Sequence, residues 1–266
     1  MGLLSYIYWD VRPEIIQFGP LGIRWYGLFF AILFVLGFLI VRWQFRVEHK
    51  DEASLDKLFL YMIGGTIVGA RLGHCLLYDP VYYWHHPVEV LEIWRGGLAS
   101  HGGAAGILIA LYFYTRRQPD QPYLWLLDRI VVPTALGGSL IRLGNLFNSE
   151  ILGTPTHVPW AFVFERMDSV PRHPVQLYES IAYALIFIVL LRTYSRLRGQ
   201  TPRGLLLGLF LVSVFTFRFG IEFLKQRQAA YGQYVPLKVG QWLSIPFIAF
   251  GAVLLWRVRR RKKSKV

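Results

Sequence analysis

The stretch VVPTALGGSLIRLGNLFNSEILG, residues 131–153, decides how the chain must fold. Its first ten residues carry no charge, whereas Arg142, Asn145, Asn148 and Glu150 follow within about three helical turns. An uncharged run of this kind suits lipid, and an ionisable group at membrane depth costs several kcal/mol unless it is paired or hydrated. The polar residues therefore either end a solvated helix or form a site set into a membrane, and the rest of the chain decides between the two.

The composition places the chain among membrane proteins. Hydrophobic residues make up 54% of the 266 residues and charged residues 17%, whereas a soluble domain carries about a quarter charged residues. The apolar residues form about seven windows of roughly 18 residues or more, a length that spans a bilayer as a helix. We therefore predict an all-α polytopic membrane protein with about seven transmembrane helices, forming a single integral membrane domain over 1–266. The expected spans are 26–42, 57–77, 98–115, 123–148, 176–194, 203–224 and 238–257.

The basic residues predict the orientation of these spans. With seven spans, one side of the membrane receives 17 Lys and Arg residues and the other side 8. Cationic loops stay in the cytoplasm, so the N-terminus is expected outside and the C-terminus inside, where 257–266 forms a basic tail. Contact with anionic lipid head groups then explains the net charge of +13 better than nucleic acid does. The long outer connections, 78–97 and 149–175, carry tryptophans, which favour the membrane interface.

Polar residues collect at the outer ends of the predicted helices. Any one of them could snorkel to the head groups, and Glu222 could merely neutralise Arg218, four residues earlier. Snorkelling does not explain histidine, asparagine and glutamate at one depth on several helices whose cytoplasmic halves hold almost no such groups. We therefore predict a one-sided cavity open to the outer leaflet. The residues that gather there include Tyr26, Arg71, His101, Arg142, Asn145, Glu150, Arg218 and Glu222.

Two arginines and a histidine suggest the chemistry of this cavity. Arg142 and Arg218 carry permanent charge and forked donors that match phosphate oxygens, and a phosphate at that depth belongs to a phospholipid head group. Histidine titrates near neutral pH, so His101 can take a proton from an incoming nucleophile. The sequence has no paired-aspartate motif and no His-Glu-x-x-His motif. No metal is therefore expected.

Seven sequence blocks carry a resemblance to a known family. The chain resembles the prolipoprotein diacylglyceryl transferases, bacterial enzymes of the inner membrane, over nearly its whole length. The run 141–153 is similar to the family's signature, although Ile141 and Leu146 stand where the family commonly has Gly and Phe. The blocks are IRWYGL (23–28), GARLG (69–73), WRGGLASHGG (94–103), IRLGNLFNSEILG (141–153), RHPVQLYES (172–180), FRFGIEF (217–223) and GQWLSIP (240–246).

The resemblance implies a reaction and a set of functional residues. The donor is phosphatidylglycerol, the acceptor is the lipobox cysteine thiol of a preprolipoprotein, and the products are a diacylglyceryl thioether and glycerol phosphate. The active site is expected to face the periplasmic leaflet of the inner membrane, with the N-terminus periplasmic. The resemblance implies no organic cofactor. The implied catalytic residues are His101, Arg142 and Arg218. The residues implied to bind and orient the phosphatidylglycerol head group are Tyr26, Arg142, Asn145, Glu150, Gly153, Arg218 and Glu222.

The region after Glu222 departs from the family's pattern. The text LKQRQAAYGQY (224–234) stands where the family has an Arg, then often a Pro and an acidic residue. This departure leaves open whether Lys225 or Arg227 contacts substrate.

Three other classes of membrane protein agree less well with the sequence. A transporter or channel needs polar lining in the cytoplasmic halves and broken helices near the midplane. A retinal-type protein needs a lysine in the middle of its last helix, whereas Lys238 lies at the edge. A metal-dependent lipid transferase needs an acidic motif that is missing here.

Overall fold

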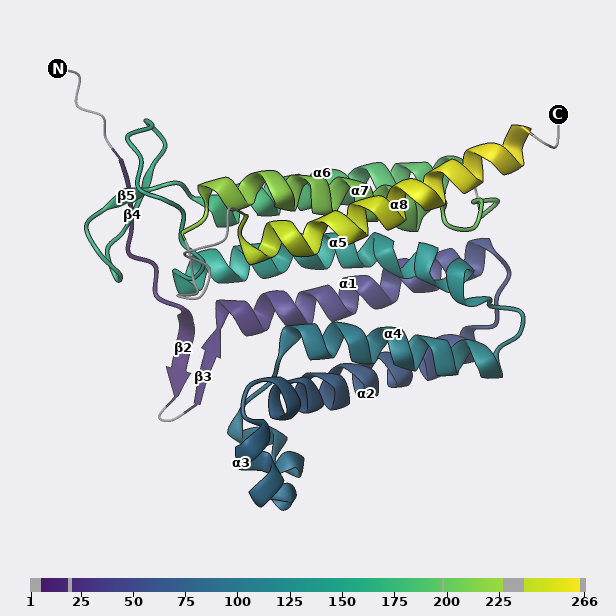
Figure 1. The fold of residues 1–266 in the computed structure, drawn as a ribbon, viewed down its shortest axis with the longest axis horizontal. Helices are drawn as coiled ribbons and strands as arrows, with labels where there is room; N and C mark the ends of the chain where they lie inside the picture. Colours follow the sequence, from purple (N-terminus) through teal and green to yellow (C-terminus); the bar gives the residue numbers. More distant parts are fainter. Residues whose placement is uncertain (1–5, 19–20, 198, 227–236, 264–266) are drawn as a thin grey trace. The chain divides into compact units, whose positions relative to one another are not determined.

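The computed structural model describes residues 6–18, 21–197, 199–226 and 237–263 (Figure 1). The chain divides into two compact units, of which the first comprises Met1–Ile40 and Asp128–Val266 and the second Val41–Leu127. Helices α1 (Trp25–Val47) and α5 (Tyr123–Asn148) each begin in one unit and end in the other.

Six helices in the described part of the chain are long and apolar enough to cross a membrane. They coincide with six of the seven predicted segments. The remaining segment, 98–115, corresponds to α4 (Ser100–Arg117), an 18-residue helix whose polar ends set it apart from the six. The six helices are Trp25–Val47, Glu52–Leu77, Tyr123–Asn148, Val175–Leu197, Leu205–Leu224 and Val239–Arg261.

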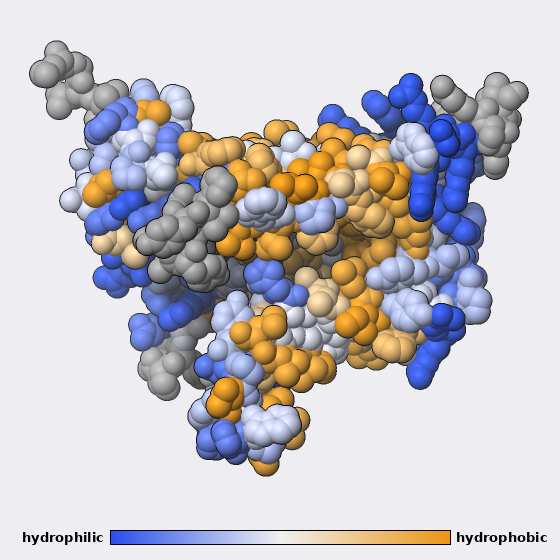
Figure 2. Space-filling model, viewed as in Figure 1, coloured by the Kyte–Doolittle hydropathy of each residue, from blue (hydrophilic) through white to orange (hydrophobic). Residues whose placement is uncertain are grey.

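The first unit contains α6 (Val175–Leu197), α7 (Leu205–Ile221), the 3-10 helix η3 (Glu222–Leu224) and α8 (Val239–Lys263) besides most of α1 and α5. Glycines on α5 let its neighbours approach closely. A Cβ added at Gly137 would lie 2.6 Å from Leu33 of α1, and one at Gly138 would lie 3.0 Å from the Tyr183 ring of α6. Helix α7 contacts both α6 and α8. Figure 2 shows a largely hydrophobic surface over α6 to α8 and a hydrophilic C-terminal end of α8, as a membrane-spanning bundle requires.

The N-terminus of α7 is capped by a side chain from α5. Asp128 is fully buried, and its carboxylate accepts hydrogen bonds from the backbone N–H groups of Gly204 at 2.6 Å and Leu207 at 2.9 Å. These are donors that the first turn of a helix leaves unsatisfied, and a negative charge is favourable there. Gly204 adopts a φ of 91°, a left-handed conformation that favours glycine.

Five short strands in the described part of the chain make the fold mostly helical rather than all-α as predicted, and they lie in the N-terminal segment and in the connection 149–175. Strand β1 (Ile7–Trp9) pairs parallel with β4 (Phe162–Phe164), and β5 (Pro171–Arg172) pairs antiparallel with β4. Strands β2 (Glu14–Phe18) and β3 (Leu21–Arg24) form a hairpin. Backbone donors outside the helices need partners, and strands this short leave no alternating pattern to recognise.

The second unit contains α2 (Glu52–Leu77) and α4, which lie side by side (Figure 1). The connection 78–97 between them is helical rather than irregular, since it forms α3 (Pro80–His85) and the 3-10 helices η1 (Pro87–Leu91) and η2 (Ile93–Arg95). Gly69 of α2 packs directly on the backbone of α4, where an added Cβ would lie 2.7 Å from the Cα of Gly106. Small residues at such a contact allow close helix packing in membranes.

Replacing Gly69 with Ala is expected to lower the thermal stability of the protein. The new methyl group meets backbone atoms that cannot move aside, and overpacking of this kind costs about 1–3 kcal/mol. Gly64→Ala is the matched control, because an added Cβ at Gly64 on the same helix meets nothing within 4 Å and Ala has the higher helix propensity. Thermal unfolding in detergent measures both variants, and equal melting temperatures would contradict the close packing.

Candidate active site

The C-terminal end of α5 places Arg142 and Asn145 on one helix face, three residues apart. The Nη1 of Arg142 donates a hydrogen bond to Oδ1 of Asn145 at 3.1 Å, and Asn145 is buried. Gly144, between them, leaves room for the Tyr26 ring of α1, because an added Cβ would lie 2.6 Å from a ring carbon. Tyr26 lies close enough to Arg142 to interact with its charge. The structure therefore brings together three of the residues that the sequence indicated.

The buried carboxylate of Glu179 on α6 joins two cations from separate segments. Its Oε2 lies 3.1 Å from Nε of Arg142, and its Oε1 accepts a hydrogen bond from Nζ of Lys225 at 2.8 Å. The Tyr183 hydroxyl also donates to Oε1, at 3.3 Å. The Glu179 side chain is 0% exposed, so its charge depends on these partners.

Lys225 extends the cluster to the end of α7. Its Nζ lies 3.4 Å from Oε1 of Glu222, and the same oxygen lies 3.9 Å from Nη2 of Arg218. Lys238 donates hydrogen bonds to the backbone carbonyls of Glu222 and Lys225. The predicted pair Arg218 and Glu222 is thus confirmed as an ion pair within a larger network, which we name the Glu179 cluster: Arg142, Glu179, Arg218, Glu222, Lys225 and Lys238.

The turn after α5 holds Glu150 against the same helix end. Its carboxylate accepts hydrogen bonds from Nδ2 of Asn145 at 3.2 Å and from Nδ2 of Asn148 at 2.7 Å. Ser149 and Ile151 adopt φ values of 55° and 56°, which are uncommon for residues other than glycine and cluster at functional sites. A pocket of about 490 Å³ opens beside this turn, lined by Asn148, Ser149, Glu150, Ile151, Leu152, Met167 and Gln226.

Gly153 lies where two backbone segments approach closely. It pairs with Lys225 as an isolated antiparallel bridge, and an added Cβ would lie 2.9 Å from the Cβ of His173. Two backbone hydrogen bonds flank the bridge, from Thr154 N to Leu224 O at 2.8 Å and from Gln226 N to Leu152 O at 3.0 Å. The backbone of Gly153 therefore helps to position Lys225.

In the connection 149–175 and the first turn of α6, the polar side chains mainly bond to one another and to nearby backbone. Gln176 donates to the Glu150 carbonyl at 2.6 Å, and Nδ1 of His173 lies 3.3 Å from the Tyr178 hydroxyl. Arg172 is buried and pairs with Asp168 at 2.6 Å. The Arg172 guanidinium holds the pKa of the Asp168 carboxyl below its usual range. Through these contacts His173 and Gln176 help to shape this connection.

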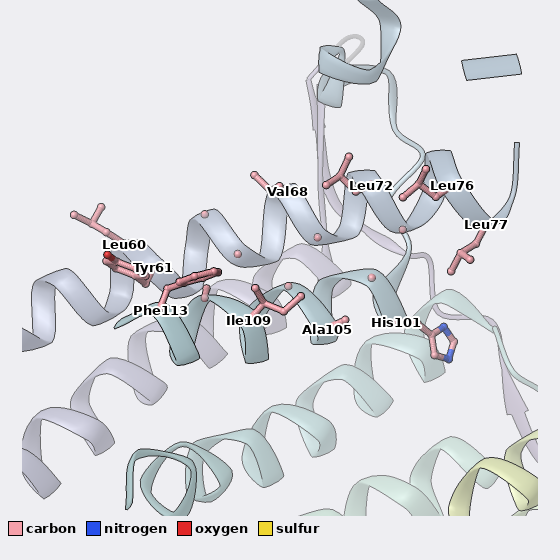
Figure 3. A pocket seen from close by; sticks show the side chains of 17 residues that line it. Leu60, Tyr61, Val68, Leu72, Leu76, Leu77, His101, Ala105, Ile109 and Phe113 are labelled. Carbon is pink, nitrogen blue, oxygen red and sulfur yellow. The ribbon is translucent and has the colours of Figure 1, made fainter. Parts of the chain in front are cut away.

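His101 belongs to the second unit, in the first turn of α4. Its side chain lies at one end of an apolar groove of about 720 Å³ between α2 and α4, as Figure 3 shows. Leu60 and Phe113 mark the other end.

Two residues that carry the site received no role from the sequence alone. Glu179 stands in the block RHPVQLYES (172–180) without a role of its own, and Lys225 was named only as an alternative to Arg227. Arg227 lies outside the described residues. A glutamate near the start of an apolar helix, four residues before Tyr183, was the signal available for Glu179.

Comparisons with known proteins identify the family of the chain. The sequence profile of the prolipoprotein diacylglyceryl transferases matches residues 13–257. A phosphatidylglycerol–prolipoprotein diacylglyceryl transferase of Chloroherpeton thalassium is 55% identical over 257 residues, covering 97% of this chain and 96% of the relative. The enzyme of the same name from Tolumonas auensis is 49% identical, covering 94% and 96%. That from Bacteroides fragilis is 43% identical, covering 99% of both chains. The chain therefore belongs to the prolipoprotein diacylglyceryl transferase family.

Proposed function

We propose that this protein transfers the diacylglyceryl group of phosphatidylglycerol to the lipobox cysteine thiol of preprolipoproteins, releasing glycerol phosphate. The activity follows from the names of relatives that cover nearly the whole chain at 43–55% identity. The structural observation that carries the proposal is the Glu179 cluster, which holds two arginines at the outer ends of α5 and α7.

The charges of the cluster suit an anionic phosphodiester. Three cations, Arg142, Arg218 and Lys225, pair with two buried carboxylates, Glu179 and Glu222. A fourth cation, Lys238, donates to the backbone carbonyls of Glu222 and Lys225. The Arg218 side chain is 29% exposed and the Arg142 side chain 15% exposed. Arg142 forms an ion pair with Glu179, and in the described structure one of its five N–H donors is used in a hydrogen bond to Asn145. The remaining donors fit a phosphate, and the excess positive charge compensates it.

The reaction moves charge toward these arginines. The thiol sulfur forms a bond to the glycerol carbon of the donor, and the carbon–oxygen bond to phosphate breaks. The bonding electrons leave with the phosphate oxygen, so the product gains negative charge where Arg142 and Arg218 bind it. Groups placed at developing charge are worth a few kcal/mol each. An unperturbed thiol has a pKa of about 8.5, and His101 is our proposed acceptor for its proton.

Tyr26, Asn145 and Glu150 have orienting roles in this proposal. Asn145 bridges Arg142 and Glu150 by its side-chain oxygen and nitrogen, so it sets the direction of the guanidinium. The Tyr26 ring packs on Gly144 and closes the same helix face. Glu222 orients Arg218 and Lys225 in the same manner.

We place the active site at the periplasmic leaflet of the bacterial inner membrane, with α4 as a seventh span. At 1.5 Å per residue α4 is about 27 Å long, close to the hydrocarbon thickness of a bilayer, and it packs along α2. Seven spans put the basic C-terminal end of α8 in the cytoplasm and the N-terminus in the periplasm. The connection 78–97 then lies at the outer interface, which fits the 84% and 76% exposure of Trp84 and Trp94.

The activity is tested with purified protein, phosphatidylglycerol vesicles and a synthetic lipobox peptide. Mass spectrometry is expected to show a gain of one diacylglycerol unit on the peptide cysteine, together with released glycerol phosphate. A peptide whose cysteine is replaced by serine is the control and should stay unmodified. Recovery of only unmodified cysteine peptide would overturn the proposal.

Replacing Arg142 or Arg218 with Lys is expected to lower kcat/KM about 100-fold, or ~2.7 kcal/mol, because lysine keeps the charge and loses the forked donors. Arg166→Lys is the matched control, since Arg166 is exposed and outside the Glu179 cluster. Initial rates at several donor concentrations give the values. Near wild-type kcat/KM in both cluster variants would remove the arginines from the proposed mechanism.

A further inference from the structure

The guanidinium of Arg71 on α2 is buried among backbone carbonyls. It is 4% exposed. Its Nε donates to Val90 O at 2.9 Å, its Nη2 to Glu89 O at 2.5 Å, and its Nη1 to Gly96 O at 2.7 Å and Gly97 O at 3.3 Å. In the described part of the chain, these carbonyls and the Tyr83 ring at 5.1 Å are its contacts, and no carboxylate pairs with it.

This arrangement makes Arg71 unsuited to bind a lipid phosphate. An arginine has five N–H donors. All three nitrogens of the Arg71 guanidinium already donate to backbone carbonyls of the connection, in four hydrogen bonds. A buried cation that is satisfied by main-chain oxygens instead fixes the chain that supplies them. That chain is the helical connection between α2 and α4.

The carbonyls come from two places in the connection. Those of Glu89 and Val90 lie in η1, beside Leu91, which is 73% exposed. Those of Gly96 and Gly97 lie in the turn that leads into α4, where φ is 85° and 70°. An added Cβ at Gly97 would lie 2.8 Å from Nη1 of Arg71, so the turn is packed directly on the guanidinium.

The turn ends four residues before His101. Its far side is fixed to α2 by a backbone hydrogen bond from Ala99 N to Ala70 O at 2.9 Å, next to Arg71. His101 follows in the first turn of α4. The path from Arg71 to His101 therefore runs through a short segment that is held at both ends by α2.

We propose that Arg71 is a positioning residue, which clamps the 86–97 connection and thereby sets the place of His101. The proposal rests on the proposed function, because it gives His101 its part in accepting the thiol proton. The hydrogen bonds to Glu89 and Val90 fix η1, which carries the exposed Leu91, beside α2. Those to Gly96 and Gly97 fix the turn that leads into α4.

The test compares Arg71→Lys with Arg116→Lys in the full-length protein in phosphatidylglycerol nanodiscs. Lysine keeps the charge, but it replaces the planar fork that reaches four carbonyls with three donors on a single nitrogen. Arg116 is the matched control, since it is an exposed arginine of the same unit that contacts the Tyr112 ring at 5.0 Å. Two readouts are taken: amide hydrogen exchange of peptides covering 86–101, and kcat and KM for diacylglyceryl transfer. Gly97→Ala is a second variant, which breaks the turn while keeping Arg71.

For Arg71→Lys we expect about tenfold faster exchange over 86–101, with exchange in the first unit unchanged. We expect kcat to fall about 100-fold, as a misplaced catalytic group does, while KM for phosphatidylglycerol stays within about twofold of wild type. Gly97→Ala should reproduce both changes, and Arg116→Lys neither.

Two results would overturn the proposal. Unchanged exchange in Arg71→Lys would show that the clamp does not hold the connection. Faster exchange with unchanged kcat would show that it holds the connection without positioning a catalytic group. If wild type and Arg116→Lys both lack transferase activity, the proposed function fails, and the exchange readout still tests the clamp separately.

Discussion

The buried carboxylate of Glu179 links three segments of the first unit by ion pairs. It is 0% exposed and contacts Arg142 of α5 and Lys225 beyond α7 at 3.1 Å and 2.8 Å. Removing one partner of a buried ion pair typically costs 3–5 kcal/mol, because an uncompensated charge stays behind. The ends of α5 and α6 and the segment after α7 are therefore held together by the interaction that also orients the arginine of the site. The Glu179 ion pairs therefore stabilise the packing of these segments and also fix the position of Arg142.

The same interaction explains why charged residues are tolerated in so apolar a protein. Arg142 reaches Glu179 and Asn145, and Lys225 reaches Glu179 and Glu222. Each of these charges thus has a partner near the end of its helix, and the buried Asp128 carboxylate is likewise satisfied, by backbone N–H groups at the start of α7. The cluster carries more cations than carboxylates, and our proposal uses this excess of positive charge to bind an anionic lipid head group.

Sequence patterns predicted the parts that depend on neighbours along one helix. Six spans follow from apolar length, and the Arg218–Glu222 pair follows from i, i+4 spacing. The role of Glu179 was not predictable in this way, because Lys225 is 46 residues away and meets it only in the folded chain. The pairing of β1 with β4 joins segments more than 150 residues apart. The carbonyls that hold Arg71 belong to main chain, which residue identities do not reveal.

A double-mutant cycle between Glu179→Gln and Arg142→Lys tests most directly whether one buried carboxylate orients the arginine that we propose to be catalytic. The measured quantity is kcat/KM for diacylglyceryl transfer in the two single variants and the double variant, with Glu165→Gln as an exposed control and melting temperatures to confirm folding. If Glu179 acts through Arg142, the loss in the double variant should stay within about threefold of the larger single loss. Losses that multiply independently would contradict a shared role and leave Glu179 as a structural residue alone.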